Sequence, residues 1–302
     1  MRRTLIVHNG ERIIKKDNWF VLQREGEEQR IPLEDIYCVV IDNQRMMLST
    51  AVLTEMTRVG AHIMLCDAKH MPAVVIYPHT NYYRPLNILR KQVLMDERLK
   101  EELWAAVVKA KLTNQAKALE LTQGGGEKVK RILELAEEVL PGESGNREGI
   151  GAKLFFRAMY GAEFIRMADD GINAALNYGY TIIRSAITKT LCAYGYNTVW
   201  GIHHINEMNH FNLADDMMEP WRPLVDLWVD AHHEELLETL SKEQRTALIG
   251  LVNRMVMFQG KRMKVHHAID RYVASLTSAL EKGEASLLKF PVMLPLETGD
   301  GK

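Results

Sequence analysis

The chain has 302 residues, of which 47% are hydrophobic and 25% are charged, and its formal net charge is −1. This composition is ordinary for a soluble globular protein and argues against disorder as the main state. The small net charge argues against a protein coated uniformly in positive charge, as a histone-like DNA-binding protein is, but it is compatible with a local basic groove.

The three cysteines, Cys38, Cys66 and Cys192, include no C-x-x-C pair. Their odd number and wide spacing argue against a disulfide framework or a structural zinc–thiolate site, and they fit a reducing compartment. The apolar part of the N-terminus is too short for the core of a signal peptide. No apolar run approaches the roughly 18 residues that a membrane span needs. We therefore expect a cytoplasmic protein with no membrane segment.

The first 80 residues are predicted to form a β-rich domain. Short runs of β-branched and aromatic residues, separated by Asn, Asp and Gly turn signals, are typical of antiparallel strands. One helix, over 48–60, is expected to end at Gly60. The proline-containing segment 77–85 is predicted to be the domain boundary. The expected strands cover residues 4–7, 11–16, 19–24, 36–42, 61–66 and 73–77.

From Leu86 onward the apolar residues follow the helical period. A long helix is expected from Leu86 to the glycine triplet at 124–126, which has no phosphate-loop pattern and is interpreted as a helix–helix connection. The tail after Phe290 is expected to be loosely held. Further helices are expected at about 127–140, 147–170, 178–195, 213–240, 242–258 and 262–282.

The predicted fold class is therefore α+β. A small antiparallel, sandwich-like β domain (residues 1–80) should precede a larger all-α domain (residues 81–302).

Metal-binding and proton-binding groups are concentrated in GIHHINEMNHFNLADDMMEPWRP, residues 201–223. His204, Asp216 and Glu219 offer an imidazole and two carboxylates without a thiol, a set that suits Mg²⁺ or Mn²⁺, and the imidazole favours Mn²⁺ or Zn²⁺. Pro220 has no N–H, so a bend at this point can turn Glu219 into a cleft. A kinked surface helix with solvated carboxylates would explain the same residues, and the pattern alone leaves both interpretations open.

Two other features of the sequence bear on this stretch. His203 and His204 are neighbours and cannot point the same way on an extended backbone, so one of them is expected to be structural. Glu148, in ESGNREGIGAKLFF, follows a turn-rich loop. It is an ordinary acidic residue for the first turn of a helix, where the helix dipole stabilises it.

Four motifs, taken in order, resemble the CRISPR-associated integrase family, the first-numbered Cas proteins, and most closely its type II branch. They are NREGIGAKLFF, LNYGYTIIRSAI, GIHH and LADDMMEPWRPLVD. The resemblance implies that Glu148, His204 and Glu219 are the catalytic residues and the ligands of Mg²⁺ or Mn²⁺, with Asp216 as a supporting acid. The doubled histidine leaves an ambiguity of one residue, which we resolve in favour of His204.

The reaction that the resemblance implies is a transesterification, in which a prespacer 3′-hydroxyl attacks a phosphodiester of a CRISPR repeat. The implied partners are double-stranded DNA, a second copy of the chain held partly through the β-rich domain, and a central dimer of the second adaptation subunit. In the type II branch, the interference nuclease and a ring-shaped accessory subunit are also implied.

DNA must be held by local positive charge. The candidate contacts are Lys261, Arg262, Lys264 and Arg271, within GKRMKVHHAIDR, and Arg84 at the start of the helical region. Arg90, Lys91, Lys109 and Lys111 flank the long helix and are further candidates. No sequence-reading motif is present, so recognition should depend on the DNA backbone and shape.

Two alternative functions use the same residues. One is a Mn²⁺- or Zn²⁺-dependent hydrolase of small phosphoesters. The other is a non-catalytic, structural DNA-binding subunit whose acids neutralise a buried arginine such as Arg222. An assay for the joining of DNA strands, with and without Mn²⁺, would distinguish the integrase from these two alternatives.

Overall fold

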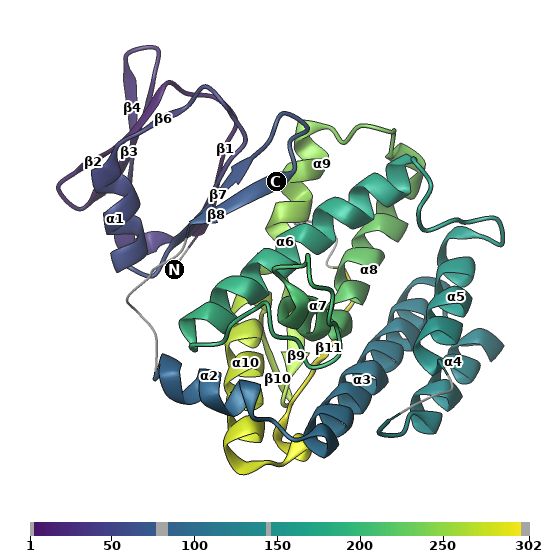
Figure 1. Ribbon diagram of the computed structural model, residues 1–302. Coiled ribbons are helices and arrows are strands. Elements are labelled where there is room, and N and C mark those ends of the chain that lie inside the picture. The colour runs from purple at the N-terminus through teal and green to yellow at the C-terminus, as the bar shows by residue number, and fades with distance from the viewer. Residues whose placement is uncertain (1–2, 77–83, 143–145, 297–302) are drawn as a thin grey trace. The chain divides into compact units, whose positions relative to one another are not determined.

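The computed structural model describes residues 3–76, 84–142 and 146–296, and the chain divides into two compact units, Met1–Tyr83 and Arg84–Lys302 (Figure 1). The division falls close to the predicted limit at residue 80. Most of the predicted boundary segment 77–85 lies outside the described residues.

The N-terminal unit contains two four-stranded sheets. The first has the strand order β1 (Arg3–Val7), β5 (Ile36–Ile41), β7 (His62–Cys66), β8 (Pro72–Ile76). The second has the order β4 (Glu27–Pro32), β3 (Trp19–Arg24), β2 (Arg12–Lys16), β6 (Met47–Leu48). A short 3₁₀ turn, η1 (Leu33–Asp35), precedes β5, and the helix α1 (Thr50–Arg58) connects β6 to β7.

The prediction of antiparallel strands was wrong for most of the first sheet. Strands β1, β5 and β7 are parallel, and only β8 runs antiparallel to its neighbour. Every residue of β5 is buried, as is typical of a central parallel strand. The helix α1, capped by the Ser49 side chain, lies in the crossover that brings the chain from β5 back to β7. Apolar side chains from both sheets and from α1 share one core: Val7, Ile13, Phe20, Ile36, Val39, Val52, Met56 and Ile63.

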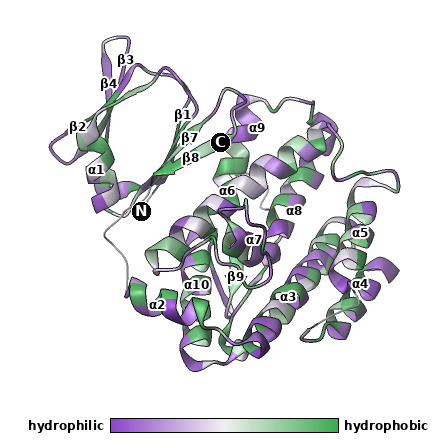
Figure 2. Ribbon diagram, in the orientation of Figure 1, coloured by the Kyte–Doolittle hydropathy of each residue, from purple (hydrophilic) through white to green (hydrophobic). Residues whose placement is uncertain are grey.

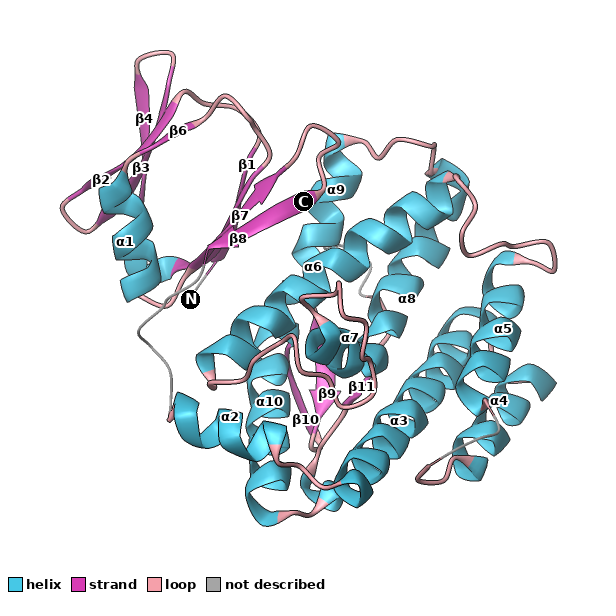
Figure 3. Ribbon diagram, in the orientation of Figure 1, coloured by secondary structure: helices cyan, strands magenta, loops and turns pink. Residues whose placement is uncertain are grey.

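The second unit is mainly helical, which confirms the predicted fold class. Figure 3 shows its helices around a small sheet. The helices are α2 (Pro85–Val93), α3 (Glu97–Gln123), α4 (Glu127–Glu138), α5 (Arg147–Tyr160), α6 (Gly171–Ala193), α7 (Asn212–Met218), α8 (Arg222–His232), α9 (Lys242–Gly250) and α10 (Val265–Lys282). The 3₁₀ turns are η2 (Glu219–Trp221), η3 (His233–Glu235), η4 (Leu251–Asn253) and η5 (Ala285–Leu287). The sheet has the order β10 (Lys261–Lys264), β9 (Met255–Phe258), β11 (Pro291–Val292).

That sheet corrects two predictions from the sequence. The segment expected to end one helix and begin the next is instead a β9–β10 hairpin. Its two-residue turn, Gln259-Gly260, has positive φ at both positions (49° and 73°), the conformation that joins tightly paired strands. The tail after Phe290 is not loose where it is described, because β11 pairs with β9 and Met293 is fully buried. Residues 297–302 of the tail lie outside the described residues.

Helix α3 is the central element around which the site is built. The single long helix expected from Leu86 is in fact two, since α2 ends at Val93 and Asp96 caps the new helix by accepting a hydrogen bond from the N–H of Leu99 (2.7 Å). Helix α3 packs against α4, α5, α8 and η2. Figure 2 shows hydrophobic and hydrophilic residues alternating along α3, α4 and α5, so each presents an apolar face for packing. No helix in the described ranges is long and apolar enough to cross a membrane.

Candidate active site

The buried face of α3 carries a lysine. Leu103, Val107 and Lys111 follow one another at four-residue spacing, so they lie on one face of the helix. The first two are fully buried, and Lys111 is only 6% exposed. A charged group at that depth needs partners of opposite charge.

Glu148 is the first of these partners. It lies in the first turn of α5, whose N-terminus is capped by Asn146. One turn further along, Gly151 lets α5 approach α3 closely, since a Cβ at this position would lie 2.2 Å from Cδ2 of Leu112. This close packing places Glu148 opposite Lys111, and Lys111 Nζ donates a hydrogen bond to Glu148 Oε1 (2.7 Å).

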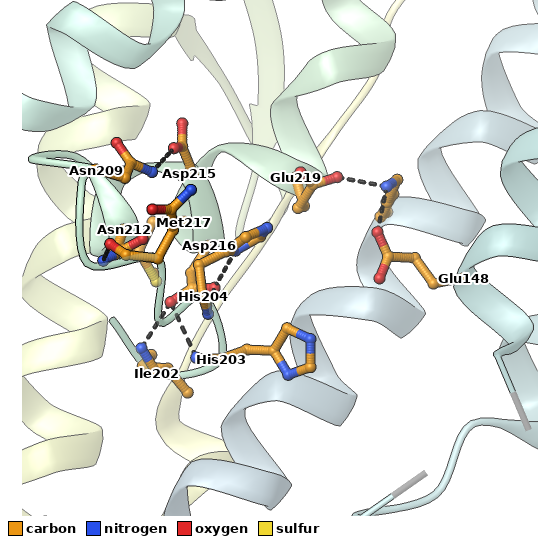
Figure 4. A network of polar contacts seen from close by, with 12 residues as sticks. Glu148, Ile202, His203, His204, Asn209, Asn212, Asp215, Asp216, Met217 and Glu219 are labelled. Atoms are coloured by element: carbon orange, nitrogen blue, oxygen red, sulfur yellow. Dashed lines mark hydrogen bonds and ion pairs between the residues drawn. The ribbon is translucent and has the colours of Figure 1, made fainter. Parts of the chain in front are cut away.

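Glu219 is the second partner. The bend predicted at the prolines is present as the 3₁₀ turn η2 between α7 and α8. Asn114 of α3 donates a hydrogen bond to the carbonyl of Pro220 (2.8 Å), which fastens this turn to α3. Glu219 is 3% exposed, and its Oε2 lies 2.5 Å from Lys111 Nζ. One ammonium group therefore bridges Glu148 and Glu219 (Figure 4).

Arg222 holds the other oxygen of Glu219. Its Nε donates a hydrogen bond to Glu219 Oε1 (2.8 Å). Burial raises the pKa of Glu219, but the positive charges of Arg222 and Lys111 outweigh this and hold it at about 2. Burial lowers the pKa of Lys111, but the negative charges of Glu219 and Glu148 have the larger effect, so the pKa is raised above its ordinary value. Glu219, Lys111 and Arg222 are therefore charged at neutral pH.

Asp216 organises the loop that carries His204. It is fully buried, and its carboxylate accepts the backbone N–H groups of Ile202 (2.6 Å), His203 (3.1 Å) and His204 (3.0 Å). The ring Nδ1 of His204 lies 2.6 Å from Asp216 Oδ1. The chain fits around this carboxylate only because residue 201 is glycine, since a Cβ there would lie 2.3 Å from the His204 carbonyl oxygen and 2.8 Å from Asp216 Oδ2.

The two histidines have different environments. The hydrogen bond with Asp216 raises the pKa of His204 against the effect of burial, and the charge of Glu219 contributes in the same direction. Figure 4 shows the His204 ring between Asp216 and Glu219. His203 is exposed, and its ring stacks on Trp104 with a centroid distance of 4.1 Å and an interplanar angle of 2°. The expectation that the two rings face different ways agrees with this geometry.

The donor set fits a divalent cation. Glu148 and Glu219 already share one cation, the Lys111 ammonium, and an imidazole lies nearby. Oε2 of Glu219 is buried, and the partner that the structure gives it is the Lys111 ammonium (2.5 Å), so a cation already lies where this oxygen would ligate a metal ion. In the described part of the chain no three His, Cys, Asp or Glu side chains are close enough together to hold one ion. The ammonium lies between the two acids, so a metal ion would have to displace it.

The sequence analysis expected Lys111 only among the candidates for DNA contact, and its position between Glu148 and Glu219 was not foreseen. The signal was available, because Lys111 continues the four-residue spacing of the buried apolar residues of α3. Asp226 was missed altogether. It is fully buried on α8, and its Oδ1 accepts a hydrogen bond from the hydroxyl of Tyr180 (2.5 Å), whose ring lies under Arg222 (4.6 Å).

The predicted DNA contacts lie elsewhere in the helical unit. Lys261, Arg262 and Lys264 belong to the β9–β10 hairpin, where the first two are exposed. Arg271, on α10, lines a hollow of about 390 Å³ together with Lys282 and Lys289. Arg84 is exposed at the N-terminus of α2, with φ 48°. Their roles in DNA binding stay predictions.

Comparison with known proteins supplies the deciding observation. The family model for CRISPR associated protein Cas1 matches residues 4–159 and 164–236. The chain belongs to the Cas1 family. The CRISPR-associated endonuclease Cas1 of Neisseria meningitidis serogroup C (strain 8013) is 35% identical to it over 297 residues, or 98% of this chain and 97% of that protein. The family assignment made from the motifs is thus confirmed, and the assignment to the type II branch stays a prediction.

Solved structures show the Cas1 fold in other settings. A casposase bound to its integration product is 18% identical, with a TM-score of 0.76 over 94% of this chain and 92% of that chain. A Cas6-RT-Cas1–Cas2 complex contains a chain that is 17% identical, with a TM-score of 0.73 over 97% of this chain and 36% of that chain. At these identities the likeness concerns the fold alone.

Proposed function

We propose that this Cas1 protein is a metal-dependent DNA integrase of CRISPR adaptation. In this reaction a DNA 3′-hydroxyl attacks a phosphodiester of a CRISPR repeat. One phosphodiester forms for each one that breaks, the attacking hydroxyl loses a proton, and the departing 3′-oxygen gains one, so no ATP is needed. The observation that carries the proposal is the convergence of Glu148 and Glu219 on one cation, beside a histidine whose ring is held by a buried carboxylate.

Glu148, His204 and Glu219 would hold Mg²⁺ or Mn²⁺. The metal, when bound, would lower the pKa of the attacking hydroxyl and offset the negative charge of the phosphate. The supporting residues prepare this arrangement. Asp216 fixes the orientation of the His204 ring, and Arg222 keeps Glu219 ionised and fixed in position. If His204 does not ligate the metal, it is the group placed to accept the proton of the attacking hydroxyl.

The proposed partners are double-stranded DNA, a second copy of the chain and the Cas2 subunit. The Cas6-RT-Cas1–Cas2 complex and the casposase bound to its integration product support the Cas2 partner and the DNA substrate, because both contain this fold. A cytoplasmic location, and a complex with the type II interference nuclease and the ring-shaped subunit, belong to the same proposal.

A strand-joining assay tests the proposal. A labelled duplex ending in a 3′-hydroxyl is incubated with repeat DNA in Mn²⁺ or EDTA, beside a control duplex ending in a 3′-dideoxynucleotide. We expect a joined product that requires both the metal and the 3′-hydroxyl. Turnover of a small phosphoester without joined DNA would favour the hydrolase. Neither activity, in a protein that still binds DNA, would favour the structural subunit.

A further inference from the structure

Lys111 occupies a position in the site that the proposed chemistry does not explain. Its ammonium lies between two acids proposed as metal ligands, 2.7 Å from Glu148 Oε1 and 2.5 Å from Glu219 Oε2. It is carried by α3, which is packed on several sides, and its side chain is 8% exposed. This is the place where a cation shared by the two acids must lie, so a divalent ion and the ammonium compete for it.

We propose that Lys111 is a positioning residue that acts as the resident counter-cation of Glu148 and Glu219 and thereby couples metal binding to DNA binding. In the free protein the ammonium holds the two acids together. A divalent ion has to displace it from both carboxylates, and this exchange becomes favourable mainly when DNA phosphates are present. The inference rests on the proposed function.

The balance of charge explains the coupling. Lys111 and Arg222 bring two positive charges, and Glu148 and Glu219 bring two negative charges, so this group of four is neutral. A divalent ion bound beside all four leaves an excess of two positive charges where Lys111 and Glu219 are almost completely buried. Excess charge at such depth is costly. DNA phosphates bring the compensating negative charge, and they give the displaced ammonium a new partner.

An ordinary structural ion pair would behave differently. If Lys111 only stabilised the fold, its removal would lower stability, while the dependence of metal binding on DNA would not change. Metal binding with and without DNA therefore separates the two roles, and neither measurement requires catalytic turnover.

The test compares Mn²⁺ binding by the wild type, Lys111→Met and Lys117→Met, alone and with a DNA duplex whose 3′ ends are dideoxy-terminated and cannot react. Methionine nearly preserves the shape of lysine without its charge. Lys117 is the matched control, because it lies on the same helix and pairs with the half-exposed Glu120 (2.8 Å), away from the site. Free Mn²⁺ is measured by electron paramagnetic resonance.

We expect DNA to strengthen Mn²⁺ binding by the wild type and by Lys117→Met. Lys111→Met should bind Mn²⁺ without DNA at least about tenfold more tightly than the wild type, since a unit positive charge has been removed next to the ion. The strengthening by DNA should be correspondingly smaller in that variant. If Lys111→Met does not fold in EDTA, Mn²⁺ should restore its circular dichroism spectrum, because the ion neutralises the same two acids.

Two results would overturn the inference. One is a Mn²⁺ affinity of Lys111→Met that equals or falls below that of the wild type, with unchanged strengthening by DNA. The other is an unfolded variant that Mn²⁺ does not rescue. If the wild type binds Mn²⁺ and joins DNA in either case, only the inference fails. If the wild type binds no Mn²⁺ even with DNA, the proposed metal-dependent function fails together with it.

Discussion

Asp216 holds His204 at two points, through the backbone N–H (3.0 Å) and through the ring Nδ1 (2.6 Å), both at the same carboxylate oxygen. A ring that donates its Nδ1–H to a carboxylate presents Nε2 as a lone pair on the opposite side, which is the form that ligates metals or accepts protons. The acid that the family motif assigns to a supporting role is thus the group that fixes the tautomer and the orientation of His204, the histidine that we propose as catalytic.

Asp216→Asn should weaken the contacts of residue 216 with the backbone N–H and with the ring Nδ1 of His204. An amide has one accepting oxygen where the carboxylate has two, so at least one of the backbone N–H groups now bound by Asp216 loses its acceptor. We expect a stability loss of at least about 2 kcal/mol. The pKa of His204 should fall, because the hydrogen bond that its ring donates to Asp216 is the largest cause of its increase. An NMR titration of the ring in EDTA, together with urea denaturation, measures both.

The pH dependence of this pair has a defined sign. A raised pKa in the folded state contributes stability that is fully present below the ordinary value of 6.5 and is lost as the pH rises through the folded-state value. The stability difference between the wild type and Asp216→Asn should therefore be larger at pH 5.5 than at pH 9. An unchanged His204 titration in the variant would contradict this assignment.

His204→Ala and His203→Ala should have different effects. His204→Ala should reduce strand joining by about 10²–10⁴-fold, or more if the ring is a metal ligand, while DNA binding survives. His203 is exposed and stacked on Trp104, so His203→Ala should cost only about 0.5–1.5 kcal/mol of stability and leave joining nearly intact. Joining rates, DNA affinity and melting temperature are measured for both variants. Full joining by His204→Ala, with joining lost in a folded His203→Ala, would show that the other histidine is catalytic.

Much of the fold could be predicted from the periodicity of the sequence, and the errors have a common cause. The change from short strands to helices near residue 80 is a local signal, and it was recognised. Strand direction is not local: IYCVVI at 36–41 looks the same in a parallel as in an antiparallel sheet, although its continuous burial favours the former. The β9–β10 hairpin was taken for helix because its turn, Gln259-Gly260, lacks the usual Asn-Gly signal.

The candidate site was predictable only in part. The motifs identified Glu148, His204 and Glu219, but spacing alone could not show that residues 71 positions apart, Glu148 and Glu219, meet at one lysine of a third helix. Gly151 and Gly201 make this geometry possible, and the need for a glycine at each depends on contacts distant in sequence. Such contacts appear only when the elements are packed together.

Asp226 should make the stability of the protein depend on pH. Burial raises its pKa to about 7, from an ordinary value of 3.8. The folded state therefore keeps a proton that the unfolded state has lost between these values, so this group lowers stability as the pH rises from about 4 to 7, by about 4 kcal/mol in total. Asp226→Asn should be more stable than the wild type at pH 8, with a much smaller difference at pH 5. Urea denaturation at the two pH values measures this, and an equal difference at both would show that Asp226 is ionised throughout.

The basic residues of the helical unit should bind DNA without reading its sequence. Lys261→Ala and Arg271→Ala should each weaken binding to unrelated duplexes by the same factor. Each should also reduce the slope of log affinity against log salt by about 0.9, the value for one lost phosphate contact. Lys117→Ala, which removes a positive charge paired with Glu120, is the control. Unchanged salt slopes in the two test variants would exclude these residues from the DNA interface.

The most direct test of the account is strand joining by Glu219→Gln in Mn²⁺. The substitution keeps the size of the side chain. It removes the negative charge of one of the two acids that share a cation, Glu148 and Glu219. The account predicts a loss of joining of about 10³-fold or more, with DNA binding retained, because the acid that helps hold the metal has lost its charge. Joining by a folded Glu219→Gln at the wild-type rate would contradict it, since the reaction would then not depend on this acid.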